Sequence, residues 1–271
     1  MMDPVEPISE RQSAILELVK KTGFATIAEL SETFYVTTQT IRRDVNALCT
    51  AQALARFHGG VGLPNSVQNE DYSNRREVLA TAKNAIGSLV RTIVPNDASL
   101  FMNIGTTTEA VAKHLRDHQR LRVVTNNIHI ADMFAKIEGF DVMVAGGHVR
   151  GSDGGVVGEA AIDFLNGFKL DFGIIGISGI DPDGSLLDFD YREVRAAQTI
   201  IANARSTILV ADHTKFGRPA MAKVASIHQV DVLVTDQPIP EAFADMVTAA
   251  GVEVLVPASV SQEGSAKTAK A

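Results

Sequence analysis

The sequence is poor in the residues that mark several common classes of protein. Its 271 residues include one cysteine, Cys49, which excludes an internal disulfide and a cysteine-based zinc site. It has no tryptophan and three tyrosines, too few for the aromatic platform on which single-stranded nucleic acid stacks. No apolar run approaches the roughly 18 residues that span a bilayer, and the first residues lack the basic and apolar blocks of a signal peptide. We therefore expect a cytoplasmic protein, with neither a metal site nor a cofactor.

An excess of positive charge is also missing, because the formal net charge is −7. That balance argues against nucleic-acid binding by the chain as a whole. Residues 37–61, however, contain three arginines and only one acidic residue, Asp44. Since only the local field has to favour phosphate, this segment can carry a basic surface on an otherwise acidic protein.

Three short helices and a hairpin are predicted for residues 1–63, which we interpret as one domain. Residues 9–12 and 26–29 have the pattern of capping boxes, and Thr37 can cap the third helix. Only a few residues separate the second helix from the third, which is the spacing of a helix-turn-helix. The pair Gly59-Gly60 is typical of a tight hairpin turn that follows these helices.

The third predicted helix has an apolar face and a polar face. Ile41, Val45 and Leu48 recur at helical spacing on the apolar side. A helix that reads the major groove needs long hydrogen-bonding side chains near its exposed N-terminal end. The predicted DNA contacts are Thr38, Gln39, Thr40, Arg42, Arg43 and Asn46 from this helix and Arg56 and His58 from the hairpin. The pattern alone also fits a solvated helix face in a protein–protein module.

Residues 64–74 have no apolar periodicity and are predicted to be a linker. From residue 75 to residue 257, short apolar strands alternate with helices, which predicts an α/β domain with a mostly parallel sheet covered on both faces. We expect the strands at residues 100–104, 121–125, 141–145, 172–177, 207–211, 230–235 and 252–256. Residues 258–271 are small and polar and are predicted to form a disordered tail.

The first of these strands runs into Gly105, which is followed by Thr106, Thr107 and Thr108. A glycine turn at a helix N-terminus presents backbone N–H groups, and three hydroxyls add donors, so this segment predicts an anion site. The same residues fit a plain capping box, from Thr106 to Glu109, that serves only the helix. The pattern leaves both interpretations open.

Other polar residues follow neighbouring strands, at the edge where open α/β sheets bind ligands. The predicted ligand contacts are Gly105, Thr106, Thr107, Thr108, Thr125, Asn126, Asn127, Gly147, Asp181 and Lys215. Lys215 is the cation best suited to a phosphate, and a solvated surface lysine is its alternative. His148, Arg150 and Glu159 fit either the site or a contact between subunits.

The run of residues 36–45, with Thr40-Ile41-Arg42-Arg43-Asp44 at its centre, and the run of residues 56–61 together resemble the winged helix-turn-helix of the DeoR family of bacterial transcription regulators. Residues 75–257 are similar to the sensor domain of that family, a Rossmann-like fold related to sugar-phosphate isomerases and coenzyme A transferases. The resemblance implies a repressor that binds double-stranded operator DNA as a homo-oligomer, a dimer or tetramer, and releases it when a sugar phosphate binds. It also implies that residues 105–108 hold the phosphate and that Asn126 and Asp181 contact hydroxyl groups.

The runs 153–160, 176–181, 183–187 and 212–218 resemble one subgroup of this family, which makes glycerol 3-phosphate the first candidate for the effector. An isomerase or deaminase of sugar phosphates is the alternative, with Asp181, Glu193 and Lys215 as acid–base groups. An interaction module without a ligand is a third possibility. An enzyme does not need a winged helix, so we favour the regulator and predict no catalytic residue.

Overall fold

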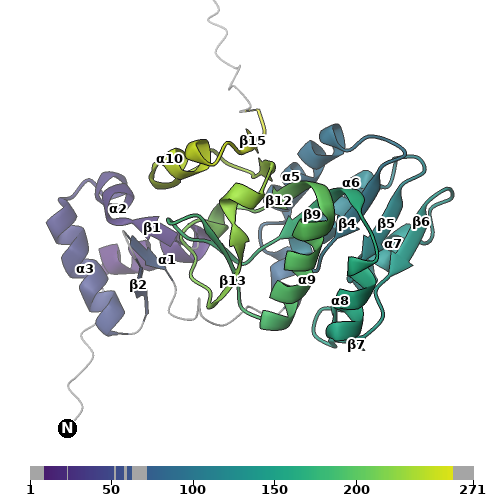
Figure 1. Ribbon diagram of the computed structural model, residues 1–271. Helices are drawn as coiled ribbons and strands as arrows, with labels where there is room; N and C mark the ends of the chain where they lie inside the picture. Colours follow the sequence, from purple (N-terminus) through teal and green to yellow (C-terminus); the bar gives the residue numbers. More distant parts are fainter. Residues whose placement is uncertain (1–8, 23, 52, 58–59, 63–71, 259–271) are drawn as a thin grey trace, which may run out of the picture.

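The computed structural model describes residues 9–22, 24–51, 53–57, 60–62 and 72–258. An N-terminal unit, residues 9–62, stands beside a larger C-terminal unit, residues 72–258 (Figure 1). None of the described helices is long and apolar enough to cross a membrane. Residues 259–271 of the predicted tail, and His58, lie outside the described residues.

The N-terminal unit contains the three helices and the hairpin that the sequence predicts. Its elements are α1 (Glu10–Thr22), β1 (Phe24–Thr26), α2 (Ile27–Thr33), α3 (Thr38–Thr50), β2 (Ala55–Phe57) and β3 (Gly60–Gly62). The strands form an antiparallel sheet in the order β1-β3-β2. Strand β1 was not predicted, because three residues are too few to leave a periodic pattern.

The predicted caps of these helices are confirmed. The Thr26 hydroxyl accepts a hydrogen bond from Glu29 N at 3.1 Å, and the Glu29 carboxylate accepts one from Thr26 N at 2.8 Å. The reciprocal pair between Ser9 and Gln12 precedes α1. The Thr37 hydroxyl accepts from Thr40 N at 3.2 Å and so caps α3. Each cap satisfies N–H groups that have no partner within the helix, which sets where the helix begins.

The core of this unit is the apolar face of α3. Ile41, Val45 and Leu48 are buried together with Ile15 and Val19 of α1. Burying one such side chain contributes about 1.5–3 kcal/mol, so this stripe is the main contact that holds α3 in place.

Asp44 is also buried on α3, and its carboxylate accepts a hydrogen bond from Arg11 Nε at 2.6 Å. The ion pair joins α1 to α3 on the side of α3 that faces the rest of the N-terminal unit. The one acidic residue of the basic segment is therefore already partnered within the N-terminal unit.

The C-terminal unit begins with two helices, where the apolar periodicity of residues 75–94 predicts a single helix after the linker. Helix α4 (Tyr72–Glu77) starts inside the predicted linker, so that prediction is wrong for residues 72–74. Helix α5 (Ala80–Ile93) follows after a break at Leu79, which has the left-handed φ of 57°. The apolar periodicity on both sides of the break hid it from sequence analysis.

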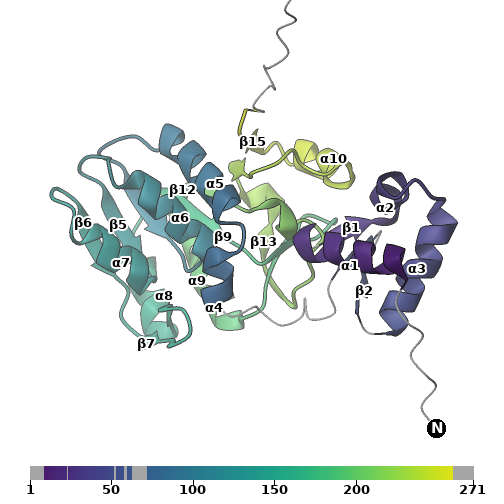
Figure 2. The ribbon, with the colours of Figure 1, turned by 180° about the vertical axis from the view of Figure 1, so that it is seen from behind.

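A seven-stranded parallel sheet forms the centre of this unit, as predicted. Its strands are β4 (Ser99–Met102), β5 (Arg122–Thr125), β6 (Asp141–Val144), β9 (Leu170–Gly176), β12 (Ala204–Val210), β14 (Val232–Val234) and β15 (Glu253–Leu255). The helices are α6 (Thr106–Leu115), α7 (Ile128–Phe134), α8 (Glu159–Asn166), α9 (Tyr191–Asn203) and α10 (Glu241–Ala249). Helices α8 and α9 cover the face seen in Figure 1, and α5, α6 and α7 cover the opposite face, seen in Figure 2.

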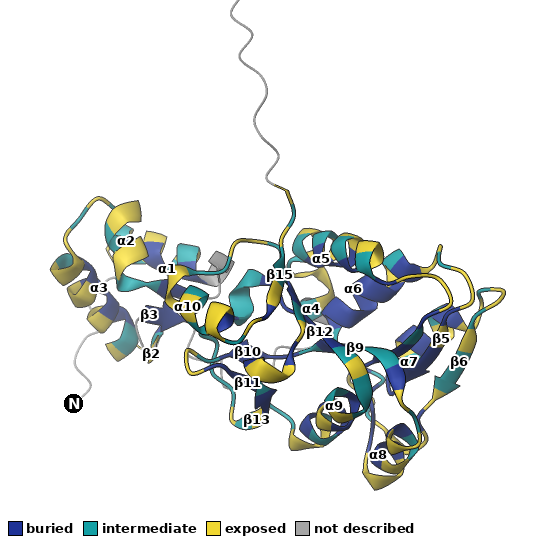
Figure 3. Cartoon of the chain, turned by 45° about the horizontal axis from the view of Figure 1, so that its top comes forward, coloured by how far each residue is buried: buried dark blue, intermediate teal, exposed yellow. Residues whose placement is uncertain are grey.

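Burial on both faces explains why the strands read as apolar runs rather than as alternating patterns. Neighbouring residues Ile174 and Ile175 of β9 are both buried, and they belong to two different core clusters. Most of the covering helices are buried on one side and exposed on the other, whereas α6, which packs against α5, is buried over most of its length (Figure 3).

The sequence did not predict the smaller strands. A second sheet has the order β10-β11-β13, with β10 (Gly179–Ile180), β11 (Ser185–Asp188) and β13 (Ala222–Ser226). Strands β7 (His148–Val149) and β8 (Val156–Val157) form a hairpin. Strands of two residues carry no periodicity, so only long-range contacts define them.

The strand order of the large sheet is β15-β14-β12-β9-β4-β5-β6. The chain leaves β4 toward β5 and β6, and then returns to β9 on the other side of β4. This reversal of direction lies at the carboxyl ends of β4 and β9, the kind of place where open α/β sheets bind ligands.

Candidate functional site

The polar face of α3 is exposed in the N-terminal unit. The predicted DNA contacts that it exposes are Thr38, Gln39, Arg42, Arg43 and Asn46. Thr40 is half-buried, and its hydroxyl lies 2.9 Å from the hydroxyl of Thr37. Because the opposite face holds the buried stripe, these polar side chains are available to a partner without any change in the core.

The hairpin and α3 contribute to one surface. Arg56 of β2 is exposed and donates a hydrogen bond to the side-chain oxygen of Asn46. Asn46 lies one helical turn after Arg42, so the cationic groups of helix and hairpin are neighbours. Sequence reasoning missed Tyr35, which is 95% exposed in the turn before α3. Its only signal was its position, between Phe34 and Val36, in the turn that joins α2 to α3.

Helix α6 begins at Gly105, and no side chain among the described residues caps its first turn. Thr106 lies inside the helix rather than at its cap, so the capping-box interpretation is wrong. The side chain of Glu109 instead contacts Tyr72 and Asn127. The first N–H groups of an uncapped helix need an acceptor, and the helix dipole favours a negative one.

The three threonines of this turn are buried, and the Thr108 hydroxyl has a role within the loop. It lies 2.7 Å from the carbonyl oxygen of Gly105 and 3.0 Å from that of Asn103, to which it can donate. The Asn103 side chain in turn exchanges two hydrogen bonds with the backbone of Gly176, at 2.9 and 3.1 Å. These contacts hold the α6 turn against the ends of β4 and β9.

Polar residues at the end of β5 lie next to this turn. The Thr125 hydroxyl donates to Met102 O at 2.7 Å, which joins β5 to β4. Asn127 caps α7 through its side-chain oxygen and donates from Nδ2 to Glu109 at 3.1 Å. Asn126 donates to Val156 O, whereas its buried Oδ1 has no hydrogen-bond partner among the described residues. That oxygen is a free acceptor near the start of α6.

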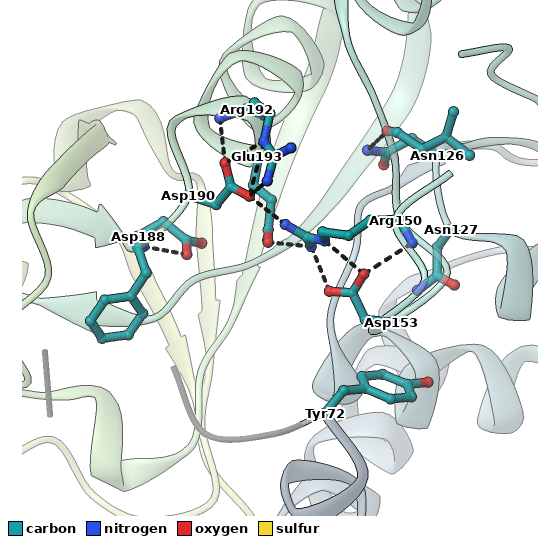
Figure 4. A network of polar contacts seen from close by, with 12 residues as sticks. Tyr72, Asn126, Asn127, Arg150, Asp153, Asp188, Asp190, Arg192 and Glu193 are labelled. Atoms are coloured by element: carbon teal, nitrogen blue, oxygen red, sulfur yellow. Dashed lines mark hydrogen bonds and ion pairs between the residues drawn. The ribbon is translucent and has the colours of Figure 1, made fainter. Parts of the chain in front are cut away.

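A cluster of carboxylates surrounds Arg150 (Figure 4). Arg150 Nε donates to Asp153 at 2.9 Å, Nη1 donates to Asp190 at 2.7 Å, and Nη2 contacts Glu193. The cluster lies between Asn126 and Asn127 on one side and Asp188 on the other. Arg150 is therefore part of a buried polar network, which the sequence had left open.

The carboxylates of this network differ in pKa because their surroundings differ. Burial and the nearby Asp188 raise the pKa of Glu193 to about 7. Hydrogen bonding to Arg192 lowers the pKa of Asp190 to about 2. Burial raises the pKa of Asp188, although Arg75 and Lys215 act in the opposite direction. Lys215 and Asp188 are thus within electrostatic reach of each other.

Lys215 lies in a short helix, η2 (His213–Lys215), that follows β12. Its Nζ is 3.7 Å from Oδ2 of the buried Asp212, an oxygen without a hydrogen-bond partner among the described residues. Burial by itself would raise the pKa of Asp212, but Lys215 and Thr214, together with Lys83 and His213, outweigh burial and lower the pKa. Sequence reasoning missed Asp188 and Asp212 as site residues. The signal was present, since both are carboxylates at the ends of strands.

Two predicted contacts, Asp181 and Gly147, remain to be described. Asp181 begins the turn between β10 and β11 and lines a cavity of about 850 Å³ with Thr26, Arg56 and Phe243. Gly147 precedes the β7–β8 hairpin, where a Cβ atom would lie only 2.9 Å from Val157 O. The glycine allows the hairpin to close, which is a structural reason for it at this position.

Comparison with known proteins supports a division into two domains. A model of the DeoR-like helix-turn-helix domain matches residues 11–67, and a model of the DeoR C terminal sensor domain matches residues 79–237. The chain is 47% identical over 240 residues to a glycerol-3-phosphate regulon repressor of Escherichia coli (strain K12), which covers 89% of this chain and 95% of the relative.

A glycerol-3-phosphate regulon repressor of Haemophilus influenzae is 45% identical over 237 residues, covering 88% of this chain and 92% of the relative. A solved ribose 5 phosphate isomerase A from Neisseria gonorrhoeae overlaps with 49% of this chain and 52% of its own, at 12% identity and a TM-score of 0.37. A likeness of that size supports no functional argument.

Proposed function

The chain belongs to the DeoR family of DNA-binding transcriptional repressors, and we propose that its operator affinity falls when its sensor domain binds glycerol 3-phosphate. The observation that carries the proposal for the sensor is the buried and uncapped N-terminus of α6. A phosphate bound there would accept from the first N–H groups of the helix and neutralise the positive end of its dipole. Residues 105–108 are its proposed binding loop.

The remainder of the ligand is a small polyol in this proposal. Asn126 Oδ1 and Asp212 Oδ2 are buried acceptors without hydrogen-bond partners among the described residues. Leaving a buried acceptor unsatisfied costs about 1–3 kcal/mol, so hydroxyl donors from a ligand would bind favourably. Thr125 and Asn127 orient the loop ends, and Lys215 supplies a cation. Asp181 and Gly147 stay predictions.

In this proposal, α3 lies in the major groove of the operator. Arg42, Gln39 and Thr38 contact base edges. Arg43 and Arg56 contact phosphates. The base contacts would determine which DNA sequence is bound, and the phosphate contacts would fix the position of the protein along the duplex. We also propose that the protein acts as a dimer or tetramer, because helix-turn-helix readers bind paired half-sites.

The direct test uses calorimetry and DNA binding together. Selection from a randomised duplex pool provides the operator, and its affinity is then measured with and without glycerol 3-phosphate. We expect glycerol 3-phosphate to bind and to release the operator, and free glycerol to do neither. Equal binding of both compounds would contradict the phosphate loop, whereas binding of a longer sugar phosphate alone would contradict only the identity of the ligand.

We propose further that the chain is not an enzyme. Of the three candidate acid–base groups, Glu193 is engaged by Arg150 and Asp181 lines the cavity beside Thr26. Absence of turnover of ribose 5-phosphate and glucosamine 6-phosphate, at protein concentrations that bind effector, is the expected result.

A further inference from the structure

Tyr72 is the first described residue after the N-terminal unit, and residues 63–71 connect it to the end of β3. Its hydroxyl lies 2.7 Å from both carboxylate oxygens of Glu109. Its ring stacks on His129, with the ring centroids 5.4 Å apart, and the Arg76 guanidinium lies over it at 5.7 Å. Three separate contacts therefore fasten this ring, which lies below Asn127 and Asp153 in Figure 4.

Glu109 is the residue that follows the proposed phosphate loop in α6. It is only 3% exposed. Its carboxylate accepts from Tyr72 and from Asn127 Nδ2 at 3.1 Å, and Arg76 Nε lies 3.7 Å away. Removing such donors from a buried carboxylate costs free energy, because its oxygens lose their hydrogen-bond partners. Any change in the local charge therefore acts on these donors.

The effector would bring such a change. A phosphate at residues 106–108 would place up to two negative charges within one helical turn of the Glu109 carboxylate, and both groups depend on the same positive helix end. Like charges at this separation raise each other's free energy, so the donors around Glu109 have to readjust.

We infer that Tyr72 couples the effector site to the DNA-binding domain through its hydrogen bond to Glu109. The inference rests on the proposed function. Tyr72 acts here as a positioning residue: it does not contact the operator, and it ties the chain entering the sensor domain to the turn that would hold the phosphate. If effector binding changes the strength of this contact, then by linkage a change in the contact also alters the affinity for the effector.

The Tyr72→Phe variant separates coupling from anchoring. Phenylalanine keeps the ring that stacks on His129 and underlies Arg76, and it removes only the hydroxyl. The matched control is Tyr191→Phe, because Tyr191 is 65% exposed at the start of α9. For each protein, operator affinity is measured at fixed salt with and without saturating glycerol 3-phosphate, and the ratio of the two affinities is the coupling factor.

We expect Tyr72→Phe to lower the coupling factor on the order of tenfold, since a hydrogen bond to a charged group contributes about that much to an equilibrium. Operator affinity without effector stays near that of the wild type, and Tyr191→Phe behaves as the wild type throughout. A purely structural role would lower the thermal unfolding midpoint and leave the coupling factor unchanged.

Glu109→Gln provides a second variant, because it keeps the shape of the side chain and removes its charge. It should also lower the coupling factor. A wild-type factor in both variants would overturn the inference while leaving the proposed function intact. A wild-type protein whose operator affinity ignores glycerol 3-phosphate would overturn both.

Discussion

Helices α3 and α6 begin in opposite ways. Helix α3 starts on the surface, and the Thr37 hydroxyl caps it. Helix α6 starts after Gly105 with a buried first turn, without a side-chain cap among the described residues. A capped end needs nothing from outside, so α3 can present its side chains to a partner. An uncapped end has free N–H groups, so α6 presents its backbone to an anion.

The largest expected effect is on operator binding by the exposed side chains of α3. Arg42→Ala should abolish specific operator binding, because one lost bidentate base contact weakens binding by about 1–3 kcal/mol and a dimer loses it in each half-site. The fold should persist, since Arg42 is exposed. Operator affinity at fixed salt is the measurement, with Arg91→Ala of α5 as control. Unchanged affinity would show that α3 does not read the groove.

Effector binding at the start of α6 should be sensitive to the loss of a single hydroxyl group. Thr107→Val keeps the branched shape but removes a hydroxyl beside the proposed phosphate, so effector affinity should fall about tenfold or more. Operator binding should be unaffected, so the variant should stay on the operator at effector concentrations that release the wild type. Thr92→Val, at an exposed position of α5, is the control. Release of operator at the wild-type effector concentration would remove residues 105–108 from the site.

Buried charge near the effector site should also make stability depend on pH. Because the pKa of Glu193 is raised to about 7, the folded state holds a proton that the unfolded state releases near pH 4.5. The free energy of unfolding should therefore fall by up to about 3 kcal/mol as pH rises from 4.5 to 7, since one unit of pKa difference corresponds to about 1.4 kcal/mol. Glu193→Gln should lack this part of the fall.

Denaturant unfolding at pH 5 and pH 8 measures the difference between wild type and variant. Asp236 raises the pKa of His213, but His213 is present in both proteins, so its contribution cancels in the difference between them. Identical pH dependence in the two proteins would mean that Glu193 does not bear the proton.

The smallest expected effect concerns the hairpin. Arg56→Ala should weaken binding to all DNA sequences alike, since Arg56 is proposed to contact phosphate. The slope of log K against log salt should become shallower by about one unit for each lost contact. A changed base preference with an unchanged slope would assign Arg56 to base reading.

How much of this could be predicted from the sequence depended on distance along the chain. Local patterns located the buried stripe of α3 and the strands of the large sheet, because periodicity reports burial. The break at Leu79 was missed because the pattern continues across it. The contact of Tyr72 with Glu109 was missed because 37 residues separate them. Likewise, nothing local indicates that Arg150 contacts Asp190.

The buried Asp44, held by Arg11, sits on α3 between the core and the exposed arginines. Its ion pair holds α3 against α1 on the buried side, so the exposed positions of α3 do not contribute to the stability of the fold. Exchanging Thr38, Gln39 and Arg42 could therefore retarget the protein to another operator while its scaffold, and its response to effector, remain those of the parent.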